Sequence, residues 1–275
     1  LWSIERWKIE GGQAALIDVR RQEDFKAGHL PGAHQIWRTD MESKAFPYAG
    51  MAASKEVMLH LLDSLGIETG QQVVVYDGAG GCNAARLWWL LNLYGHAPVA
   101  LLDGGPQAWQ ALGNALEVGQ VEAPTPTGFQ FCCKPKSNLL ATQEDVKNAA
   151  SNGTLILDTR TDDEYSGRRM KNGATRAGRI PGSLQFNWGN AVNLNDLGTI
   201  KSTQDLTWDF QEAGIDFTQP IITYCHTGVR SAHTTFVLRN VLGFNQVSNY
   251  DGSWSEWSFS EELPLEADEP VNPEL

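Results

Sequence analysis

The chain has little cysteine and no long apolar run. Four cysteines in 275 residues do not make a disulfide scaffold, so we expect free thiols in a reducing compartment. No apolar stretch approaches the length that spans a bilayer, and the opening LWSIERWKIEGG lacks the charged and apolar regions of a signal peptide. We therefore expect a cytoplasmic protein. A periplasmic one is the alternative, because a chain that starts without Met is open to N-terminal trimming.

Positive charge is also scarce. Lys and Arg total 21 against 33 Asp and Glu, which leaves a net charge of −12. Broad binding to DNA or RNA needs a basic face that displaces counterions, and docking on anionic lipid needs basic clusters. We therefore expect no nucleic-acid partner and no membrane partner. A small anionic substrate is still compatible, because a local group of arginines can outweigh a distant net charge.

The chain repeats itself. Residues 73–109 match residues 221–257 at a constant offset of 148, and two earlier motifs, LIDVR (16–20) and HLPGA (29–33), match LILDTR (155–160) and RIPGS (179–183). The paired positions of the longer match are Tyr76 and Tyr224, Gly80 and Gly228, Leu90 and Leu238, Gly95 and Gly243, Asp103 and Asp251, and Trp109 and Trp257. One register held over this span predicts two homologous domains, at 1–119 and 137–275, joined by a proline-containing linker at 120–136.

The second copy carries ten residues, between Arg160 and Arg179, that the first copy lacks. They fall in or near GRRMKNGATRAG, the most basic short stretch of this acidic chain. Its cations are Arg168, Arg169, Lys171 and Arg176.

Strand and helix signals alternate along both copies. Short apolar runs predict strands at 16–19, 73–76, 99–102 and 221–224, and helical patterns predict helices at 54–65, 84–93 and about 230–242. Ser54 is placed to cap the first helix, whose apolar residues are Val57, Leu61, Leu62 and Leu65. This alternation predicts α/β domains, each with a mainly parallel sheet and helices on both faces, and ligands outside the carboxyl ends of the strands.

The loop that follows the strand at 221–224 reads CHTGVRS. Its backbone N–H groups can converge on one point, and the positive end of the next helix points to the same place. Both effects stabilise a thiolate, so Cys225 is the predicted nucleophile, with a buried structural cysteine as the alternative. Cys82 falls inside the equivalent loop and is interpreted as structural, and Cys132 and Cys133 lie in the linker with no evident role.

With these motifs the chain resembles a tandem-domain rhodanese, a thiosulfate or 3-mercaptopyruvate sulfurtransferase, over nearly its whole length. The motifs are Asp158–Arg160, repeated at Asp18–Arg20, Gly178–Ser183, repeated at Gly28–Ala33, the loop Cys225–Arg230, and the ending Asp251–Trp257. The resemblance implies that Cys225 accepts sulfane sulfur as a persulfide and passes it to cyanide or another thiophile, without a metal or an organic cofactor. It also implies a catalytically silent first copy, because Asp77 stands opposite Cys225 and a carboxylate cannot carry that sulfur.

The substrate-binding residues that we predict are the loop residues His226, Thr227, Gly228, Val229 and Arg230, with Arg176 and Arg179 as further cations. Arg168 and Arg169 are candidates of the same kind, and a solvated basic loop is the alternative for each arginine of the insert. Asp158 and Arg160 are expected to form a structural ion pair near the site, because the silent copy keeps Asp18 and Arg20.

Departures from the family leave the donor open. The loop CHTGVRS matches neither the mercaptopyruvate enzymes nor the animal thiosulfate enzymes, which place cations where His226 and Thr227 stand and an arginine where Glu164 stands. Thiosulfate is the predicted donor, with 3-mercaptopyruvate as the alternative. A rhodanese-like cysteine phosphatase is disfavoured because it needs five residues between its cysteine and arginine. A non-catalytic sulfur-relay or binding module is the remaining class, and the acceptor could be a protein such as a thioredoxin-like one.

Overall fold

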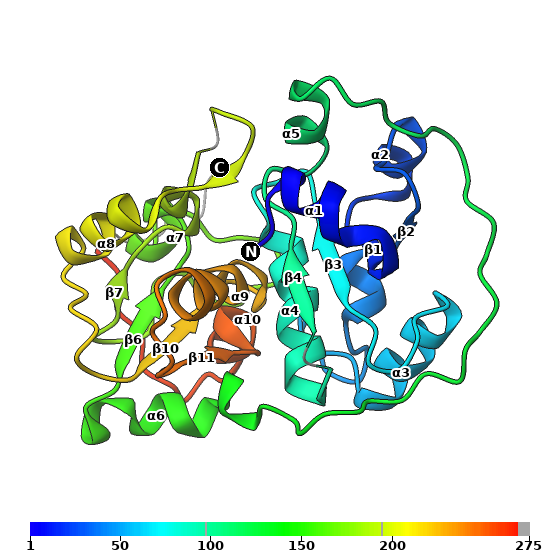
Figure 1. The fold of residues 1–275 in the computed structure, drawn as a ribbon. Coiled ribbons are helices and arrows are strands. Elements are labelled where there is room, and N and C mark those ends of the chain that lie inside the picture. Colours follow the sequence, from blue (N-terminus) through cyan, green and yellow to red (C-terminus); the bar gives the residue numbers. More distant parts are fainter. Residues whose placement is uncertain (97, 194, 269–275) are drawn as a thin grey trace. The chain divides into compact units, whose positions relative to one another are not determined.

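The computed structural model describes residues 1–96, 98–193 and 195–268, which form two compact units (Figure 1). Unit 1 consists of Leu1–Glu42, Ala52–Ser137 and Val192–Ile200. Unit 2 consists of Ser43–Met51, Asn138–Ala191 and the chain from Lys201 onward. The predicted domain ranges are contiguous, whereas each compact unit also contains a short segment from the other copy of the repeat.

Unit 1 is built on a four-stranded parallel sheet in the order β2-β1-β3-β4. The strands are β1 (Ala15–Asp18), β2 (Ala33–Gln35), β3 (Val73–Tyr76) and β4 (Val99–Leu101). All four residues of β3, VVVY, are buried, so both faces of the sheet are covered at this strand. The predicted parallel α/β architecture is confirmed.

Five α-helices belong to the described part of unit 1: α1 (Ile4–Glu10), α2 (Gln22–Ala27), α3 (Lys55–Ser64), α4 (Cys82–Tyr94) and α5 (Gly105–Ala111). Ser54 caps α3 as predicted, since its hydroxyl accepts the N–H of Val57 at 3.3 Å. The apolar residues of this helix are not all buried. Met58 and Leu62 are its buried residues, whereas Val57 is 49% exposed because it lies on the outer face.

Unit 2 has a five-stranded parallel sheet in the order β5-β11-β10-β6-β7. Its strands are β5 (Leu140–Ala141), β6 (Leu155–Asp158), β7 (Leu184–Gln185), β10 (Ile221–Tyr224) and β11 (Val247–Tyr250). Its helices are α6 (Gln143–Asn152), α7 (Asp162–Ser166), α8 (Thr203–Glu212), α9 (Val229–Phe236), which continues as a π-helix η5 (Val237–Val241), and α10 (Ser253–Phe259). Short 3-10 turns occur at Gly11–Gln13, Arg38–Met41, Ser137–Leu139 and Trp188–Ala191.

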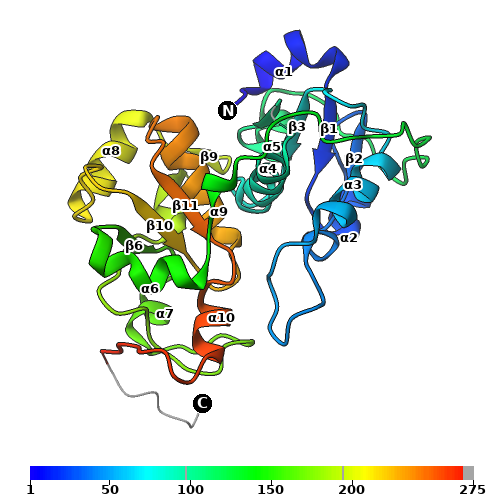
Figure 2. The same ribbon diagram turned by 90° about the horizontal axis from the view of Figure 1, so that it is seen from below.

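The two exchanged segments occupy nearly equivalent positions of the repeat. We call them the 43–51 segment and the 192–200 segment. An antiparallel bridge between Glu42 and Ala52 closes the neck of the first, which Figure 2 shows as the long blue loop preceding α3. The second is closed by the antiparallel strands β8 (Val192–Asn193) and β9 (Thr199–Ile200). Both segments are therefore closed loops, held at their ends by backbone hydrogen bonds.

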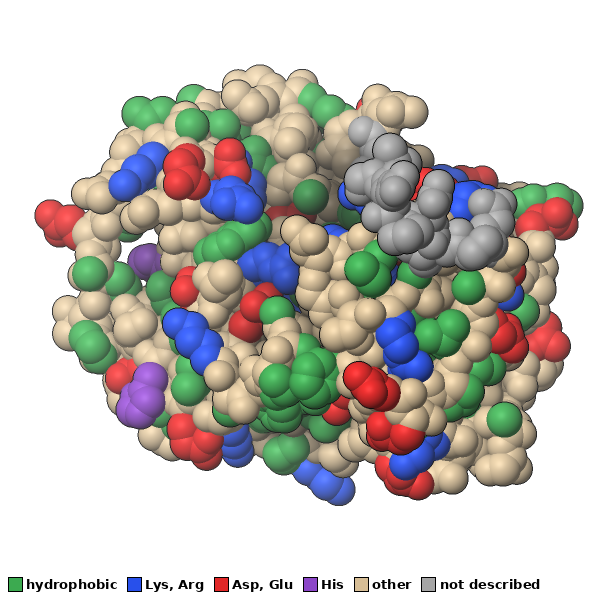
Figure 3. Space-filling model, turned by 180° about the vertical axis from the view of Figure 1, so that it is seen from behind, with side chains coloured by type: hydrophobic (Ala, Val, Ile, Leu, Met, Phe, Trp, Pro, Cys, Tyr) green, Lys and Arg blue, Asp and Glu red, His purple; other side chains and the backbone are tan. Residues whose placement is uncertain are grey.

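Within the described ranges, no helix has both the length and the apolarity needed to cross a bilayer. On the face shown in Figure 3, basic side chains lie among acidic ones.

Candidate active site

The loop at the carboxyl end of β10 places Cys225 at the N-terminus of α9. The strand ends at Tyr224, and α9 begins at Val229 after Gly228, whose φ of 73° is in the left-handed region that favours glycine. Cys225 is only 1% exposed. The helix therefore directs its free N–H groups toward the end of the strand from which the cysteine emerges.

Ser253, at the start of α10, fixes the backbone of Cys225. Its hydroxyl accepts the N–H of Cys225 at 3.1 Å and donates to the carbonyl of Tyr250 at 2.7 Å. Ser253 itself has a φ of 50°, an unusual conformation for a residue with a side chain. The sequence analysis did not assign a role to Ser253, although it singled out the ending Asp251–Trp257 in which this residue lies.

The environment of Cys225 stabilises the thiolate despite its burial. Burial by itself would raise the pKa of the thiol, but the positive charge of Arg230 and hydrogen bonds from the backbone N–H groups of Ser231 and Thr227 oppose it. The opposing effects are larger together, so the pKa of Cys225 lies below its ordinary value. This is the electrostatic condition that a thiolate nucleophile requires.

Arg230 is held by a carboxylate from α7. Its two terminal nitrogens, Nη1 and Nη2, lie 2.6 and 2.8 Å from the two carboxylate oxygens of Glu164. Burial would raise the pKa of Glu164, but Arg230 lowers it to about 2, so the carboxylate is ionised at neutral pH. Sequence reasoning noted the unusual glutamate but missed this pairing, because 66 residues separate the partners.

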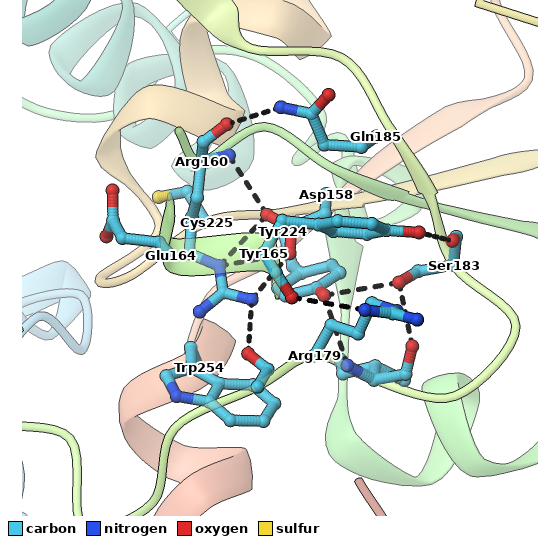
Figure 4. A network of polar contacts seen from close by, with 12 residues as sticks. Asp158, Arg160, Glu164, Tyr165, Arg179, Ser183, Gln185, Tyr224, Cys225 and Trp254 are labelled. Atoms are coloured by element: carbon cyan, nitrogen blue, oxygen red, sulfur yellow. Dashed lines mark hydrogen bonds and ion pairs between the residues drawn. The ribbon is translucent and has the colours of Figure 1, made fainter. Parts of the chain in front are cut away.

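Asp158 and Arg160 form a buried ion pair beneath the site (Figure 4). Arg160 Nη2 lies 2.6 Å from Asp158 Oδ2 and 2.8 Å from the carbonyl of Gly178, and the guanidinium stacks over Trp254. Unit 1 contains the same arrangement between Arg20, Asp18 and the carbonyl of Gly28. The pair is present in both copies, including the one with Asp77 at the position of Cys225, which agrees with the structural role predicted for it.

His226 connects the Cys225 loop to the basic insert. Its Nε2 lies 2.9 Å from the carbonyl of Asn172, which fits a neutral ring that donates from Nε2. Burial lowers the pKa of His226 to about 4, so the ring carries no charge at neutral pH. His226 is therefore placed to anchor the insert, and it adds no positive charge for an anion.

Arg176 and Arg179 have partners elsewhere in unit 2. Arg176 donates to carbonyls at and beyond the end of α10, those of Trp257, Ser258, Ser260, Glu261 and Leu263. Arg179 pairs with Asp268 at 2.7 Å and lies over the ring of Tyr165. Arg168 makes an exposed pair with Asp163. The structure thus brings Arg230 to Cys225 but gives Arg176 and Arg179 contacts that stabilise the fold, and their binding of substrate stays a prediction.

The equivalent loop of unit 1 holds a carboxylate where unit 2 has its thiol. Asp77 follows β3, and its two oxygens accept four backbone N–H groups, from Ala79, Gly81, Asn83 and Ala84, at 2.6–3.1 Å. Burial raises the pKa of Asp77, and these four donors oppose the rise. The offset of the repeat maps the donors onto Thr227, Val229, Ser231 and Ala232 of unit 2. The loop is therefore shaped so that N–H groups converge on an acceptor at its centre.

The other cysteines lie away from this arrangement. Cys82 is the buried first residue of α4. The thiols of Cys132 and Cys133 are 3.3 Å apart in the stretch that joins the two copies, and Cys132 is exposed. Among residues 1–96, 98–193 and 195–268, no three His, Cys, Asp or Glu side chains are grouped as they would be to hold a metal ion.

Comparison with known proteins gives one family and close relatives. The model of the rhodanese-like domain matches the chain twice, at residues 6–112 and 142–260. A Mycobacterium bovis protein named "Putative thiosulfate sulfurtransferase 1" is 35% identical over 261 residues, which cover 91% of each chain. A Saccharopolyspora erythraea protein that carries the same name without the numeral is 33% identical, over 96% of this chain and 94% of its own.

Solved structures share the fold. A variant of EanB in complex with ergothioneine superposes with a TM-score of 0.83 at 25% identity, and YnjE with a TM-score of 0.81 at 25% identity. Each comparison covers 94% of this chain. The chain spans 65% of the EanB chain and 64% of the YnjE chain.

Proposed function

Because the chain belongs to the rhodanese-like family of sulfurtransferases, we propose that it transfers the outer sulfur of thiosulfate to cyanide or another thiophile through a persulfide on Cys225. The observation that carries the proposal is the pair of matched loops. One holds the Asp77 carboxylate with four N–H groups, and the other presents a buried thiol with a lowered pKa at the same position. A persulfide anion would meet the same set of donors.

In the first step the Cys225 thiolate attacks the outer sulfur of thiosulfate. A new sulfur–sulfur bond forms on Cys225, the sulfur–sulfur bond of thiosulfate breaks, and sulfite leaves with the bonding electron pair. Arg230 contributes a fixed positive charge beside the reacting sulfur, shared with Glu164. The backbone N–H groups of the loop, which need no reorientation, donate hydrogen bonds to the negatively charged terminal sulfur of the persulfide.

In the second step the acceptor attacks the terminal sulfur of the persulfide. Cyanide takes this sulfur to form thiocyanate, and the electron pair of the broken bond returns to Cys225 as the thiolate. Sulfite leaves before the acceptor reacts, so the two substrates alternate on one site. The two steps need no oxidant, reductant or further reactant besides the two substrates and Cys225.

The choice of thiosulfate as donor is supported by the names of relatives that match over nearly the whole chain. The site also suits thiosulfate because this donor has no carboxylate that a side chain of the site must bind. Glu164 already occupies the end-on fork formed by the two terminal nitrogens of Arg230, so this fork does not bind the carboxylate of 3-mercaptopyruvate. The two donors can be compared directly in the same assay.

The test loads the protein with thiosulfate and measures its intact mass. We expect one added sulfur atom on the wild type, removed by cyanide with release of thiocyanate. Cys225→Ser should lose both the mass increase and the thiocyanate, whereas Cys82→Ser, which changes a buried cysteine of the silent loop, should keep them. A Cys225→Ser protein that still gains sulfur and forms thiocyanate contradicts the mechanism. A wild-type protein that gains sulfur from 3-mercaptopyruvate but not from thiosulfate contradicts the proposed donor.

A further inference from the structure

The 43–51 segment lies against the loop that carries Cys225, although it comes from the silent copy of the repeat. We propose that this segment is a positioning element of the active site, in which Gly50 holds Thr227 in the place that directs its N–H at the Cys225 sulfur. The inference rests on the proposed sulfur-transfer function and adds a component that neither the family match nor the relatives' names assign.

The contact between Gly50 and Thr227 leaves no room for a side chain. A Cβ atom on Gly50 would lie 2.4 Å from Thr227 Cβ and 2.9 Å from its Cα and its carbonyl oxygen. Gly50 also has a φ of 99°, which favours glycine for a second reason. The backbone of the 43–51 segment therefore packs directly on the residue that follows His226 in the loop.

A tyrosine anchors the segment on the other side. The hydroxyl of Tyr48 donates to Glu256 Oε1 at 3.0 Å, and its ring packs against Phe259, with centroids 5.5 Å apart. Both partners belong to α10, the helix whose first residue, Ser253, accepts the N–H of Cys225. The segment thus joins two elements that each hold the backbone around the thiol.

The contact matters because Thr227 is one of the groups that stabilise the thiolate. Its backbone N–H faces the Cys225 sulfur, and the equivalent N–H in unit 1, that of Ala79, donates to Asp77 at 2.8 Å. Hydrogen bonds to a charged sulfur depend on distance and angle, and a displacement of about 1 Å is enough to cost much of the rate. A small displacement of Thr227 should therefore destabilise the thiolate form of Cys225, and so raise the pKa of this thiol, without disrupting the fold.

The molecule contains a matched control for this contact. Gly198 lies at the repeat offset from Gly50, also has a positive φ of 65°, and belongs to the 192–200 segment of unit 1. There it faces Gly80 of the silent loop, and a Cβ would lie 3.6 and 3.8 Å from the Gly80 nitrogen and Cα, which are ordinary contacts. Alanine at Gly198 therefore also places a residue with a side chain at a positive φ, but without pressing on the Cys225 loop.

The experiment compares Gly50→Ala with Gly198→Ala in the full chain. Two readouts are used: the pH dependence of alkylation of Cys225 by iodoacetamide, and kcat and KM for thiosulfate. We expect Gly50→Ala to raise the pH at which Cys225 becomes reactive and to lower kcat by roughly 10- to 100-fold. Gly198→Ala should stay within about twofold of wild type in both. Equal behaviour of the two variants overturns the proposal.

Tyr48→Phe keeps the test decisive if Gly50→Ala does not fold. It removes the hydrogen bond to Glu256 without a steric conflict, so we expect the same directions with a smaller loss, roughly two- to tenfold. A Tyr48→Phe protein with unchanged alkylation and unchanged kcat would overturn the proposal in that case. Alkylation needs no sulfur donor, so a wild type that fails to react with thiosulfate would contradict the proposed function and leave this measurement valid.

Discussion

At Cys225, burial and charge act on the thiol in opposite directions. Burial favours the neutral thiol, whereas Arg230, Ser231 and Thr227 favour the thiolate. Of the single interactions that favour the thiolate, the charge of Arg230 is the strongest, and Glu164 holds its guanidinium in place. The reactivity of the cysteine therefore depends on a partly buried charge pair, and a change in either partner should be visible in the titration of the thiol.

Arg230→Gln should raise the pKa of Cys225, because it removes the largest effect that lowers it. The alkylation rate of Cys225 at neutral pH should then fall, and its rise with pH should move toward more alkaline values. Lys201→Gln, which breaks the partly buried pair of Lys201 with Asp209 in the same unit, is the control and should leave the profile unchanged. An identical alkylation profile for Arg230→Gln and wild type would show that the guanidinium does not set the charge state of the thiol.

Much of this residue-level chemistry could be predicted from the loop CHTGVRS and its repeat. A cysteine after a buried strand and before a helix has few alternative interpretations, and Asp77 at the matching position marks the copy predicted to be silent. The Glu164 pairing could not be predicted, because it joins α7 to α9 across the fold and leaves no local pattern. Ser231 lies in the same loop, but the sequence gives it no distinguishing signal, and only the fold shows its contribution to the thiolate.

At the level of elements, the basic insert of unit 2 supports the end of a helix. α10 has only seven residues, and its last carbonyl groups have no partners within the helix. Arg176 supplies donors to these groups and to the turn that follows. The sequence shows where the insert lies, and its charge suggested a role in substrate binding. A run of cations does not reveal which carbonyl groups the side chains contact, so the role at the end of α10 could not be predicted.

Arg176→Lys and Arg176→Gln separate these two roles. Neither side chain reproduces a planar fork that reaches several carbonyls, so we expect both to lower the unfolding midpoint, by about 2–6 °C. The measurement is thermal unfolding, with KM for thiosulfate determined alongside. Unchanged midpoints would contradict the structural role. A KM that rises in Arg176→Gln and not in Arg176→Lys would show that the charge also attracts the donor.

Across the whole molecule, the constant offset of 148 residues predicted two copies of one fold, and the two parallel sheets confirm it. The strands β3 and β10 lie where the apolar runs placed them. The exchange of the 43–51 and 192–200 segments could not be foreseen, because an irregular loop has no periodicity and its packing partners are remote in the chain. Each unit is consequently incomplete without a segment whose flanking residues belong to the other.

Asp77→Ala should destabilise both units together. The substitution leaves four buried or partly buried N–H groups without their acceptor, at a cost of roughly 2–4 kcal/mol in the free energy of unfolding. Because each unit contains a segment of the other copy, we expect β3 and β10 to lose hydrogen-exchange protection at the same denaturant concentration, shifted equally from wild type. Loss of protection in β3 alone would show that the units unfold independently.

The exchanged segments also change what counts as one module of this protein. A gene fragment that ends in the linker at 120–136 encodes the whole first copy of the repeat, yet its product lacks the segment around Gly198 that completes unit 1. The complementary fragment encodes Cys225 and lacks Gly50 and Tyr48. Each half of the chain therefore supplies a segment that the compact unit of the other half contains. Transplanting or truncating either half removes part of the other unit, so the two halves form a complete structure only as one polypeptide.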